Sequence, residues 1–202
     1  MTPAVIMLHG RGAGPENILD LVPRLGRPQF RYVAPAAPDR TWYPFSFMAE
    51  IDKNQPHLSH ALGQVRGTVD EVVAGGVPLN LIVLLGFSQG ACLASEFMIR
   101  NPGRYGGLIA FSGGAIGPAG ASWQPPGSFD GTPMFFGCSD VDAHVPETRV
   151  RETSDVCTRA GAQVTTRIYP GMGHLINDDE IAHAQRVLDA VLVTAGQGAA
   201  KV

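Results

Sequence analysis

Ser88 lies in the sequence Gly-Phe-Ser-Gln-Gly at residues 86–90, directly after a mostly aliphatic run at residues 79–85. The run is typical of a strand buried on both faces, and the small residues after Ser88 are typical of a helix that starts at once. A chain that passes so sharply from strand to helix strains the backbone of its middle residue and exposes that residue's side chain. Only small neighbours permit such a turn, so we interpret Ser88 as a nucleophile.

Histidine is the natural base for this serine, because a serine hydroxyl attacks an ester at neutral pH only if a base takes its proton. His174 follows the last expected strand on a hinge formed by Gly171 and Gly173. It also comes after the serine and the candidate acids, and the order serine, aspartate, histidine is typical of hydrolases with a strand-turn-helix serine. We therefore predict that His174 is the base.

The other five histidines have structural interpretations. His9, the second contender for the base, precedes a glycine-rich loop, and we expect it to hold that loop in place. The remaining four lie at or within expected helices, where we expect surface or capping positions: His57, His60, His144 and His183.

Two aspartates, Asp140 and Asp142, follow the strand expected at residues 133–137. The acid of such a site accepts a hydrogen bond from the second ring nitrogen of the histidine and stabilises the imidazolium. We favour Asp142 for this role because it is nearer to the helix start at Pro146. We expect Asp140 to cap the loop.

Negative charge that builds up on a substrate oxygen requires preorganised hydrogen-bond donors. The backbone N–H of Gln89, directly after the nucleophile, is one such donor. The second is expected from the glycine-rich loop at residues 9–14, and we assign it to the N–H of Arg11. That loop matches neither Gly-x-Gly-x-x-Gly nor a P-loop, so we favour the oxyanion role over phosphate binding.

Strands and helices alternate along the chain. The apolar patterns predict strands at residues 4–8, 31–34, 79–85, 108–111, 133–137 and 163–169, and helices at 16–25, 58–73, 91–99, 146–160 and from 178 onward. This alternation is typical of a mostly parallel central sheet with helices on both faces. Reactive groups in such sheets gather at the carboxyl ends of strands, where Ser88, Asp142 and His174 fall. We expect one α/β domain over residues 1–202.

Residues 35–48 combine four aromatic side chains and a methionine with three prolines. So many prolines exclude a regular helix and a central strand. The segment either seals the edge of the core or forms the wall of an apolar acyl pocket, and both can hold at once. We predict five substrate-binding residues here: Trp42, Tyr43, Phe45, Phe47 and Met48. The proline- and glycine-rich stretch at residues 117–131 indicates an irregular excursion whose role the sequence does not reveal.

The formal net charge is −3, and no Lys/Arg cluster occurs. Binding to nucleic acid requires concentrated positive charge, so we do not expect a nucleic-acid partner. No apolar run approaches the roughly 20 residues that span a bilayer, and the first residues lack the basic flank of a signal peptide. We therefore expect no stable membrane insertion and a cytoplasmic location.

Three cysteines, Cys92, Cys138 and Cys157, are odd in number and show no Cys-x-x-Cys spacing. That pattern predicts neither a disulfide framework nor a metal site. Free cysteine is among the most buried residue types, so we expect all three to be reduced and buried.

Four motifs carry a resemblance to a known family. They are Val-Ile-Met-Leu-His-Gly-Arg-Gly at residues 5–12, Gly-Phe-Ser-Gln-Gly at 86–90, Asp-Val-Asp-Ala-His-Val-Pro at 140–146 and Gly-Met-Gly-His at 171–174. In this order and spacing the chain resembles the phospholipase/carboxylesterase family of α/β-hydrolases, which includes the acyl-protein thioesterases. The resemblance implies an α/β-hydrolase fold, a Ser88–Asp142–His174 triad and an oxyanion hole from Arg11 and Gln89. It also implies hydrolysis of carboxylic esters or thioesters without a cofactor or metal.

The sequence departs from the acyl-protein thioesterases at two places. The first loop continues as Gly-Ala-Gly at residues 12–14 where they usually have Gly-Asp, and the tryptophan segment reads Trp-Tyr-Pro-Phe-Ser-Phe at 42–47 instead of Trp-Phe-Asp. Both changes affect the expected acyl wall. We therefore expect a serine carboxylesterase for small to medium acyl esters, with thioesters and lysophospholipids as further substrates.

Two other functions remain open at this point. One is a lactone hydrolase similar to dienelactone hydrolases, although these typically have a cysteine at the position of Ser88. The other is a receptor with a hydrolase fold that binds an ester without cleaving it. The expected partner is a small-molecule ester, and the apolar segment at residues 42–48 would also permit a homodimer.

Overall fold

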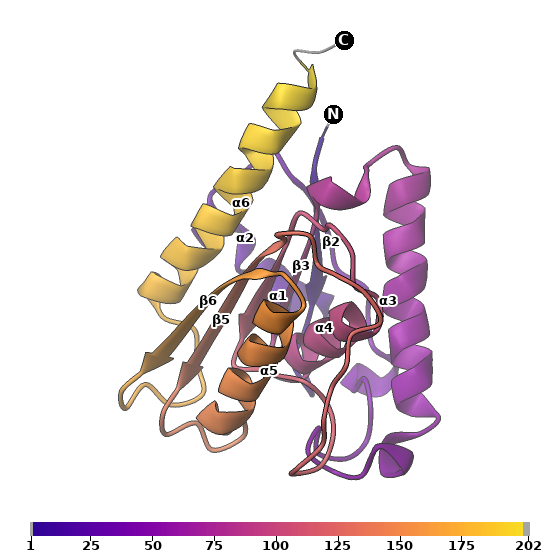
Figure 1. Ribbon diagram of the computed structural model, residues 1–202, viewed down its shortest axis with the longest axis vertical. Coiled ribbons are helices and arrows are strands. Elements are labelled where there is room, and N and C mark those ends of the chain that lie inside the picture. Colours follow the sequence, from indigo (N-terminus) through magenta and orange to yellow (C-terminus); the bar gives the residue numbers. More distant parts are fainter. Residues whose placement is uncertain (1, 200–202) are drawn as a thin grey trace.

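The computed structural model describes residues 2–199. Within this range six parallel strands form one sheet in the order β2-β1-β3-β4-β5-β6. The strands are β1 (Ala4–Leu8), β2 (Arg31–Val33), β3 (Ile82–Phe87), β4 (Gly107–Phe111), β5 (Pro133–Ser139) and β6 (Gln163–Tyr169). Figure 1 shows the arrowheads of β5 and β6 pointing the same way, toward the lower edge of the molecule in that view.

Helices cover both faces of this sheet (Figure 1). One face carries α3 (His57–Ala74), α4 (Gln89–Arg100) and α5 (Glu147–Arg159), and the other carries α1 (Pro15–Leu19), α2 (Val22–Leu25) and α6 (Asp178–Ala199). Because helices bury both faces, the residues of β1 are fully buried, as are residues 82–85 of β3. The prediction of a parallel sheet between helical layers is therefore confirmed.

The helix expected at residues 16–25 is wrong in one respect, because the structure divides it into α1 and α2. Pro23 lacks the backbone N–H for the helical ladder, and its ring would collide with the carbonyl of Leu19 in a continuous helix. Gly26, at φ 59°, ends α2 in the left-handed conformation. The strand expected at residues 79–85 also starts later, because Leu79–Leu81 form a 3-10 turn before β3.

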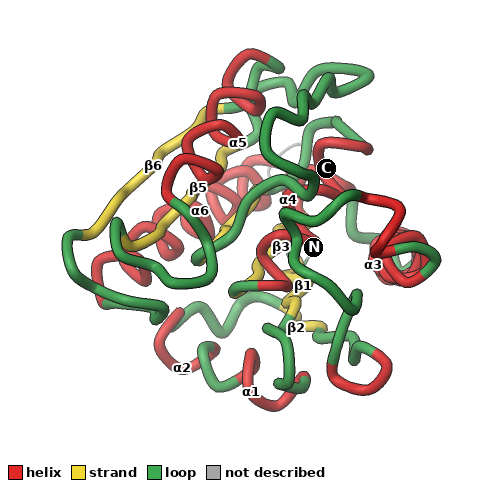
Figure 2. The backbone as a smooth tube through the Cα atoms, turned by 90° about the horizontal axis from the view of Figure 1, so that it is seen from below, coloured by secondary structure: helices red, strands yellow, loops and turns green. Residues whose placement is uncertain are grey.

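Strand register determines which loops meet at the carboxyl edge, which Figure 2 views from below. Gly86 of β3 lies opposite Leu8 of β1, so the glycine-rich loop after β1 emerges beside the turn after β3. Ser139 lies opposite Tyr169, so the loops after β5 and β6 also emerge side by side. Four segments far apart in the sequence therefore meet at one edge.

Two further observations concern the sequence-based expectations. All three cysteines are buried and free, as predicted. No helix within residues 2–199 is long and apolar enough to cross a membrane.

Candidate active site

Ser88, His174 and Asp142 form one hydrogen-bonded line at the carboxyl edge of the sheet. The Nε2 atom of His174 lies 2.9 Å from the Oγ atom of Ser88, and Nδ1 lies 2.7 Å from Oδ2 of Asp142. The three residues follow β3, β6 and β5, respectively. This is the geometry that proton transfer from a serine to an oriented imidazole requires.

Close packing explains the two glycines around Ser88. Ser88 itself has φ 55° and ψ −120°, a conformation that non-glycine residues rarely adopt. A Cβ at Gly86 would lie 2.5 Å from the backbone nitrogen of Ala91, and one at Gly90 would lie 2.7 Å from the carbonyl oxygen of His9. Neither glycine has a positive φ. The turn therefore requires glycine because strand, helix and loop approach closely, and the strain lies at Ser88.

Asp142 is held as a carboxylate by the chain around it. Its side chain is fully buried, and Oδ1 accepts the backbone N–H groups of His144 at 2.8 Å and Val145 at 3.0 Å. Burial raises the pKa of Asp142, but the hydrogen bonds from His174 and these two N–H groups outweigh it, so the pKa lies below its ordinary value. Asp142 is thus ionised at neutral pH and faces the histidine.

The loop that carries His174 is fastened to the loop after β5. Oδ1 of Asp140 accepts the N–H of Gly171 at 2.8 Å, and Oγ of Ser139 accepts the N–H of Gly173 at 3.0 Å. Both glycines have positive φ, at 64° and 77°. Asp140 therefore caps this loop, as predicted.

His9 has the structural role predicted for it. The ring is buried, its Nε2 accepts the N–H of Ala37 at 3.0 Å, and its Nδ1 lies 2.8 Å from the carbonyl oxygen of Gly10. Since Nε2 is an acceptor, the proton belongs on Nδ1, which donates to Gly10. Through these two hydrogen bonds, His9 connects the glycine-rich loop to Ala37, which precedes the aromatic residues of the segment 35–48.

One histidine interpretation is wrong, and a second histidine lies at the cavity. His183, expected at the surface or in a cap, is buried and stacks on Phe135 with ring centroids 4.8 Å apart. His144 is exposed, as expected, but it also lines the cavity next to Ser88, and its ring meets the ring of His174 edge to face at 4.8 Å. His144 lies within the motif at residues 140–146, but the motif does not indicate that its ring meets His174, because that contact depends on the register between β5 and β6. His57 and His60 are exposed at the start of α3, as expected.

Two backbone donors lie next to Ser88. A Cβ at Gly10 would be 3.6 Å from the Cβ of Ser88, so the glycine-rich loop contacts the nucleophile turn. The N–H of Arg11 makes no hydrogen bond to any residue in the range 2–199. Gln89 is the first residue of α4, where N–H groups lack an intrahelical acceptor. The two predicted oxyanion donors, the N–H groups of Arg11 and Gln89, therefore lie beside the turn of Ser88. Neither N–H has a backbone acceptor among the described residues.

A cavity of about 480 Å³ opens onto Ser88 and His174. The aromatic segment supplies one wall of it, through Tyr43, Pro44, Phe45, Ser46 and Phe47. Trp42 and Met48, which we predicted as substrate-binding residues, do not line it. Trp42 is buried with its indole N–H donating to the carbonyl of His9 at 2.9 Å, and Met48 packs against the core. The predicted segment thus lines the cavity, whereas the side chains of Trp42 and Met48 do not.

Side chains from three other segments hold this wall. The Arg11 guanidinium donates to the carbonyls of Pro44 and Phe45, both at 2.7 Å. The Gln89 side chain accepts the N–H of Trp42 at 3.1 Å and donates to the carbonyl of Tyr43 at 2.8 Å. Buried Asn54 accepts the N–H of Phe45 at 2.8 Å. Arg11 and Gln89, whose main chains lie beside the nucleophile, therefore also position the wall with their side chains. The sequence did not reveal this double role.

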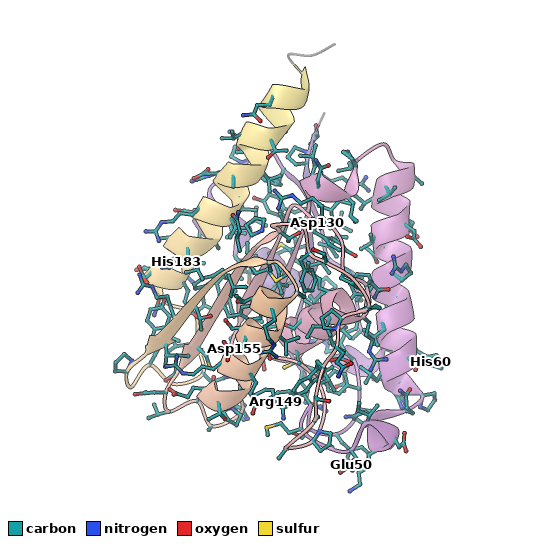
Figure 3. The ribbon with its side chains drawn as sticks, viewed as in Figure 1. Glu50, His60, Asp130, Arg149, Asp155 and His183 are labelled. Carbon is teal, nitrogen blue, oxygen red and sulfur yellow. The ribbon has the colours of Figure 1, made fainter. Side chains whose placement is uncertain are left out.

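Buried Arg149 explains how the excursion at residues 117–131 is held. Its guanidinium donates to the carbonyls of Ala115, Gly117 and Pro118 at 2.7–3.0 Å and lies over the ring of Trp123. Figure 3 shows Arg149 at the end of α5 that lies at the carboxyl edge of the sheet. The N–H of Gly117 in turn donates to the carbonyl of Phe47 at 2.8 Å, so the excursion supports the far end of the cavity wall.

Glu180 lies in the first turn of α6, and its carboxyl group is fully buried. Its Oε2 accepts the N–H of Asn177 at 2.9 Å, and Asn177 accepts the N–H of Glu180 at 2.8 Å. Its Oε1 atom is buried without a hydrogen-bond partner among the described residues. Burial raises the pKa of Glu180 from 4.5 to about 7, with further contributions from Asp179 and Asp142.

This pKa predicts that the fold loses stability as pH rises. Below pH 4.5 the carboxyl group of residue 180 is protonated in both the folded and the unfolded protein. The stability that depends on its protonation is lost as pH rises from there through the folded-state pKa of about 7. Glu180→Gln keeps the reciprocal cap and removes the charge. We expect the free energy of unfolding of the variant, relative to that of the wild type, to increase by about 2–3 kcal/mol between pH 5 and pH 8. Urea titrations at the two pH values measure this difference. The matched control, exposed Glu71→Gln, should show no such growth, and an equal advantage at both pH values would contradict the prediction.

Comparisons with known proteins identify the family of the chain. Residues 1–192 match a family model described as Phospholipase/Carboxylesterase. A probable carboxylesterase of Arabidopsis thaliana, SOBER1-like, is 26% identical over 200 residues, covering 90% of this chain and 76% of that protein. Acyl-protein thioesterase 1 of Eremothecium gossypii is 28% identical over 212 residues, covering 93% and 88%.

The solved structures agree on the fold. The crystal structure of a phospholipase/carboxylesterase from Dyadobacter fermentans has a TM-score of 0.87 and 42% identity, covering 95% of this chain and 90% of that chain. The crystal structure of Arabidopsis thaliana SOBER1 has a TM-score of 0.77 at 19% identity. The predicted α/β-hydrolase fold is confirmed.

Proposed function

Since the chain belongs to the phospholipase/carboxylesterase family, we propose that it hydrolyses small to medium acyl esters through an acyl-enzyme on Ser88. The observation that carries this proposal is the line of hydrogen bonds from Asp142 through His174 to Ser88. This line ends in a cavity with an aromatic wall. A nucleophile, its base and a place for an acyl group are therefore together at one edge of the sheet.

In the proposed reaction, Oγ of Ser88 attacks the ester carbonyl while Nε2 of His174 takes its proton. Asp142 accepts a hydrogen bond from the Nδ1–H of His174 and stabilises the imidazolium that forms. The backbone N–H groups of Arg11 and Gln89 donate to the tetrahedral oxyanion, and donors of this kind contribute roughly 3–4 kcal/mol each. His174 then protonates the departing alcohol, and water, activated by the same histidine, releases the acid.

The cavity supports acyl groups of limited size. Its wall of Tyr43, Phe45 and Phe47 is apolar and is tied down by Arg11 and Gln89. Cys92 also lines the cavity, but burial raises the pKa of its thiol to about 12, so it remains a neutral thiol. The proposed nucleophile is therefore the serine, and thioesters and lysophospholipids remain candidate substrates alongside oxygen esters.

A fluorophosphonate probe tests the reaction type directly. We expect one adduct per chain, located on Ser88 by peptide mass spectrometry, and hydrolysis of p-nitrophenyl acetate and butyrate with higher kcat/KM than the laurate. A folded protein that forms no adduct and cleaves none of the esters would instead support the receptor interpretation. Preference for a lactone such as dihydrocoumarin over the acyclic esters would support the lactone hydrolase interpretation. Size-exclusion chromatography would decide whether the protein is a dimer.

A further inference from the structure

His144 lies against the base of the proposed triad without being part of it. Its ring is exposed and lines the cavity, and its centroid is 4.8 Å from that of His174. The backbone N–H of the same residue donates to Asp142 at 2.8 Å, which holds the start of the side chain in place. The imidazole is therefore positioned by the acid of the site and is open to a ligand.

The reaction geometry indicates which part of the ester reaches this ring. The departing oxygen must lie within hydrogen-bond distance of His174 Nε2, because that atom protonates it. Because the His144 ring contacts the His174 ring and lines the same cavity, an alcohol half that extends from this oxygen can reach His144. The aromatic wall at residues 43–47 remains for the acyl half.

The charges around the cavity favour an anion. Among the described residues that line it there is no aspartate or glutamate, whereas Arg11, His144 and His174 are present. Arg11 is exposed, uses its guanidinium on two neutral carbonyls, and has no carboxylate partner among the described ion pairs.

Two carboxylates outside the cavity, those of Asp142 and Glu16, have partners of their own. The Asp142 side chain is fully buried, and its hydrogen bonds are satisfied by His174 and two N–H groups. Glu16, at the end of the glycine-rich loop, pairs with Arg40 at 3.6 Å. In a protein with net charge −3, the cavity is therefore lined by one formally charged side chain among the described residues, the cation Arg11, and by two imidazoles that add positive charge when protonated.

We propose that the preferred esters carry an anionic group on the alcohol half and that His144 binds it, with Arg11 adding a favourable field. This inference rests on the proposed esterase function and deepens it by naming a substrate class and a specificity-determining residue. An imidazole donates an N–H in either protonation state and adds a charge when protonated, so it suits a carboxylate, sulfate or phosphate. Uniform binding of this kind lowers KM more than it raises kcat.

The test compares two acetate esters that differ in the charge of the leaving group. 4-Acetoxybenzoate is anionic, and its methyl ester is the neutral counterpart with the same acyl group. His144→Phe keeps an aromatic ring against His174 but removes the N–H donors. We expect the anionic-to-neutral ratio of kcat/KM to fall about tenfold in this variant, mainly through KM, and added salt to lower the ratio more in the wild type than in the variant, which keeps only Arg11. Because ratios are compared between proteins, the intrinsic reactivities of the two esters cancel.

Three controls make the outcomes distinct. His57→Phe, an exposed histidine outside this cavity, should leave the ratio unchanged. Hydrolysis of both esters with an unchanged ratio in His144→Phe would overturn this inference and leave the esterase proposal intact, whereas no hydrolysis and no fluorophosphonate adduct would overturn the esterase proposal itself. A second pair places the anion on the acyl half, as monophenyl succinate and its methyl ester. If His144→Phe changes that ratio instead, the assignment of the anion to the alcohol half is wrong.

Discussion

Replacing Ser88 with alanine should lower kcat/KM for p-nitrophenyl butyrate by about 10⁴- to 10⁶-fold, because no other group can form the acyl-enzyme. The two neighbouring nucleophilic candidates are unsuited to replace it. Burial raises the pKa of the Cys92 thiol to about 12, and Ser112 is fully buried. The residual rate would come from the oxyanion donors and the cavity alone. Steady-state kinetics with purified protein measure the effect.

Ser112→Ala is the matched control for this variant. Ser112 also follows a strand, and at φ 48° its backbone is as unusual as that of Ser88 at φ 55°. Its Oγ has no hydrogen-bond partner among the described residues, so its loss should change kcat/KM by less than about threefold. More than 1% of wild-type activity in Ser88→Ala, with contaminating esterase excluded by fluorophosphonate inhibition, would refute the acyl-enzyme on Ser88.

Gly90→Ala should destabilise the protein by about 3 kcal/mol or more, although alanine is the better helix former. The new Cβ would lie 2.5 Å from the carbonyl carbon of Leu8 and 2.7 Å from the carbonyl oxygen of His9. These are backbone atoms of the central strand β1 and of the loop that follows it, so they cannot yield as a flexible side chain would. Helix α4 would have to move away from β1, which separates the nucleophile turn from the glycine-rich loop.

Urea denaturation of Gly90→Ala beside Gly63→Ala measures this effect. Gly63 lies in α3, and a Cβ there meets no atom within 4 Å. That variant should gain about 0.5–1 kcal/mol from the lower backbone entropy of its unfolded state. Equal stability of the two variants would show that the close approach of α4 to β1 does not constrain the fold.

Local sequence patterns were sufficient for the strands, most helices and the positions of Ser88, Asp142 and His174. A buried strand is recognisable from consecutive apolar residues, and in a parallel sheet every strand delivers its following loop to the same edge. The residue after a strand can therefore be placed at that edge before any contact is known. Asp140 could be predicted as a loop cap because Asp142, nearer to the helix start, was the better candidate for the acid of the same loop.

Only the tertiary structure decided which side chains of a loop face the site. Trp42 and Tyr43 are neighbours of similar character, yet Trp42 turns to the carbonyl of His9 while Tyr43 lines the cavity. His144 reaches His174 across 30 residues because β5 and β6 pair in one register. Side-chain direction in irregular segments depends on hydrogen-bond partners from distant parts of the chain, and no local pattern encodes those partners. The sequence alone thus determined the candidate reactive groups and their common edge. The packing between distant segments determined the aromatic wall, the side chains that hold it and the position of His144 beside His174.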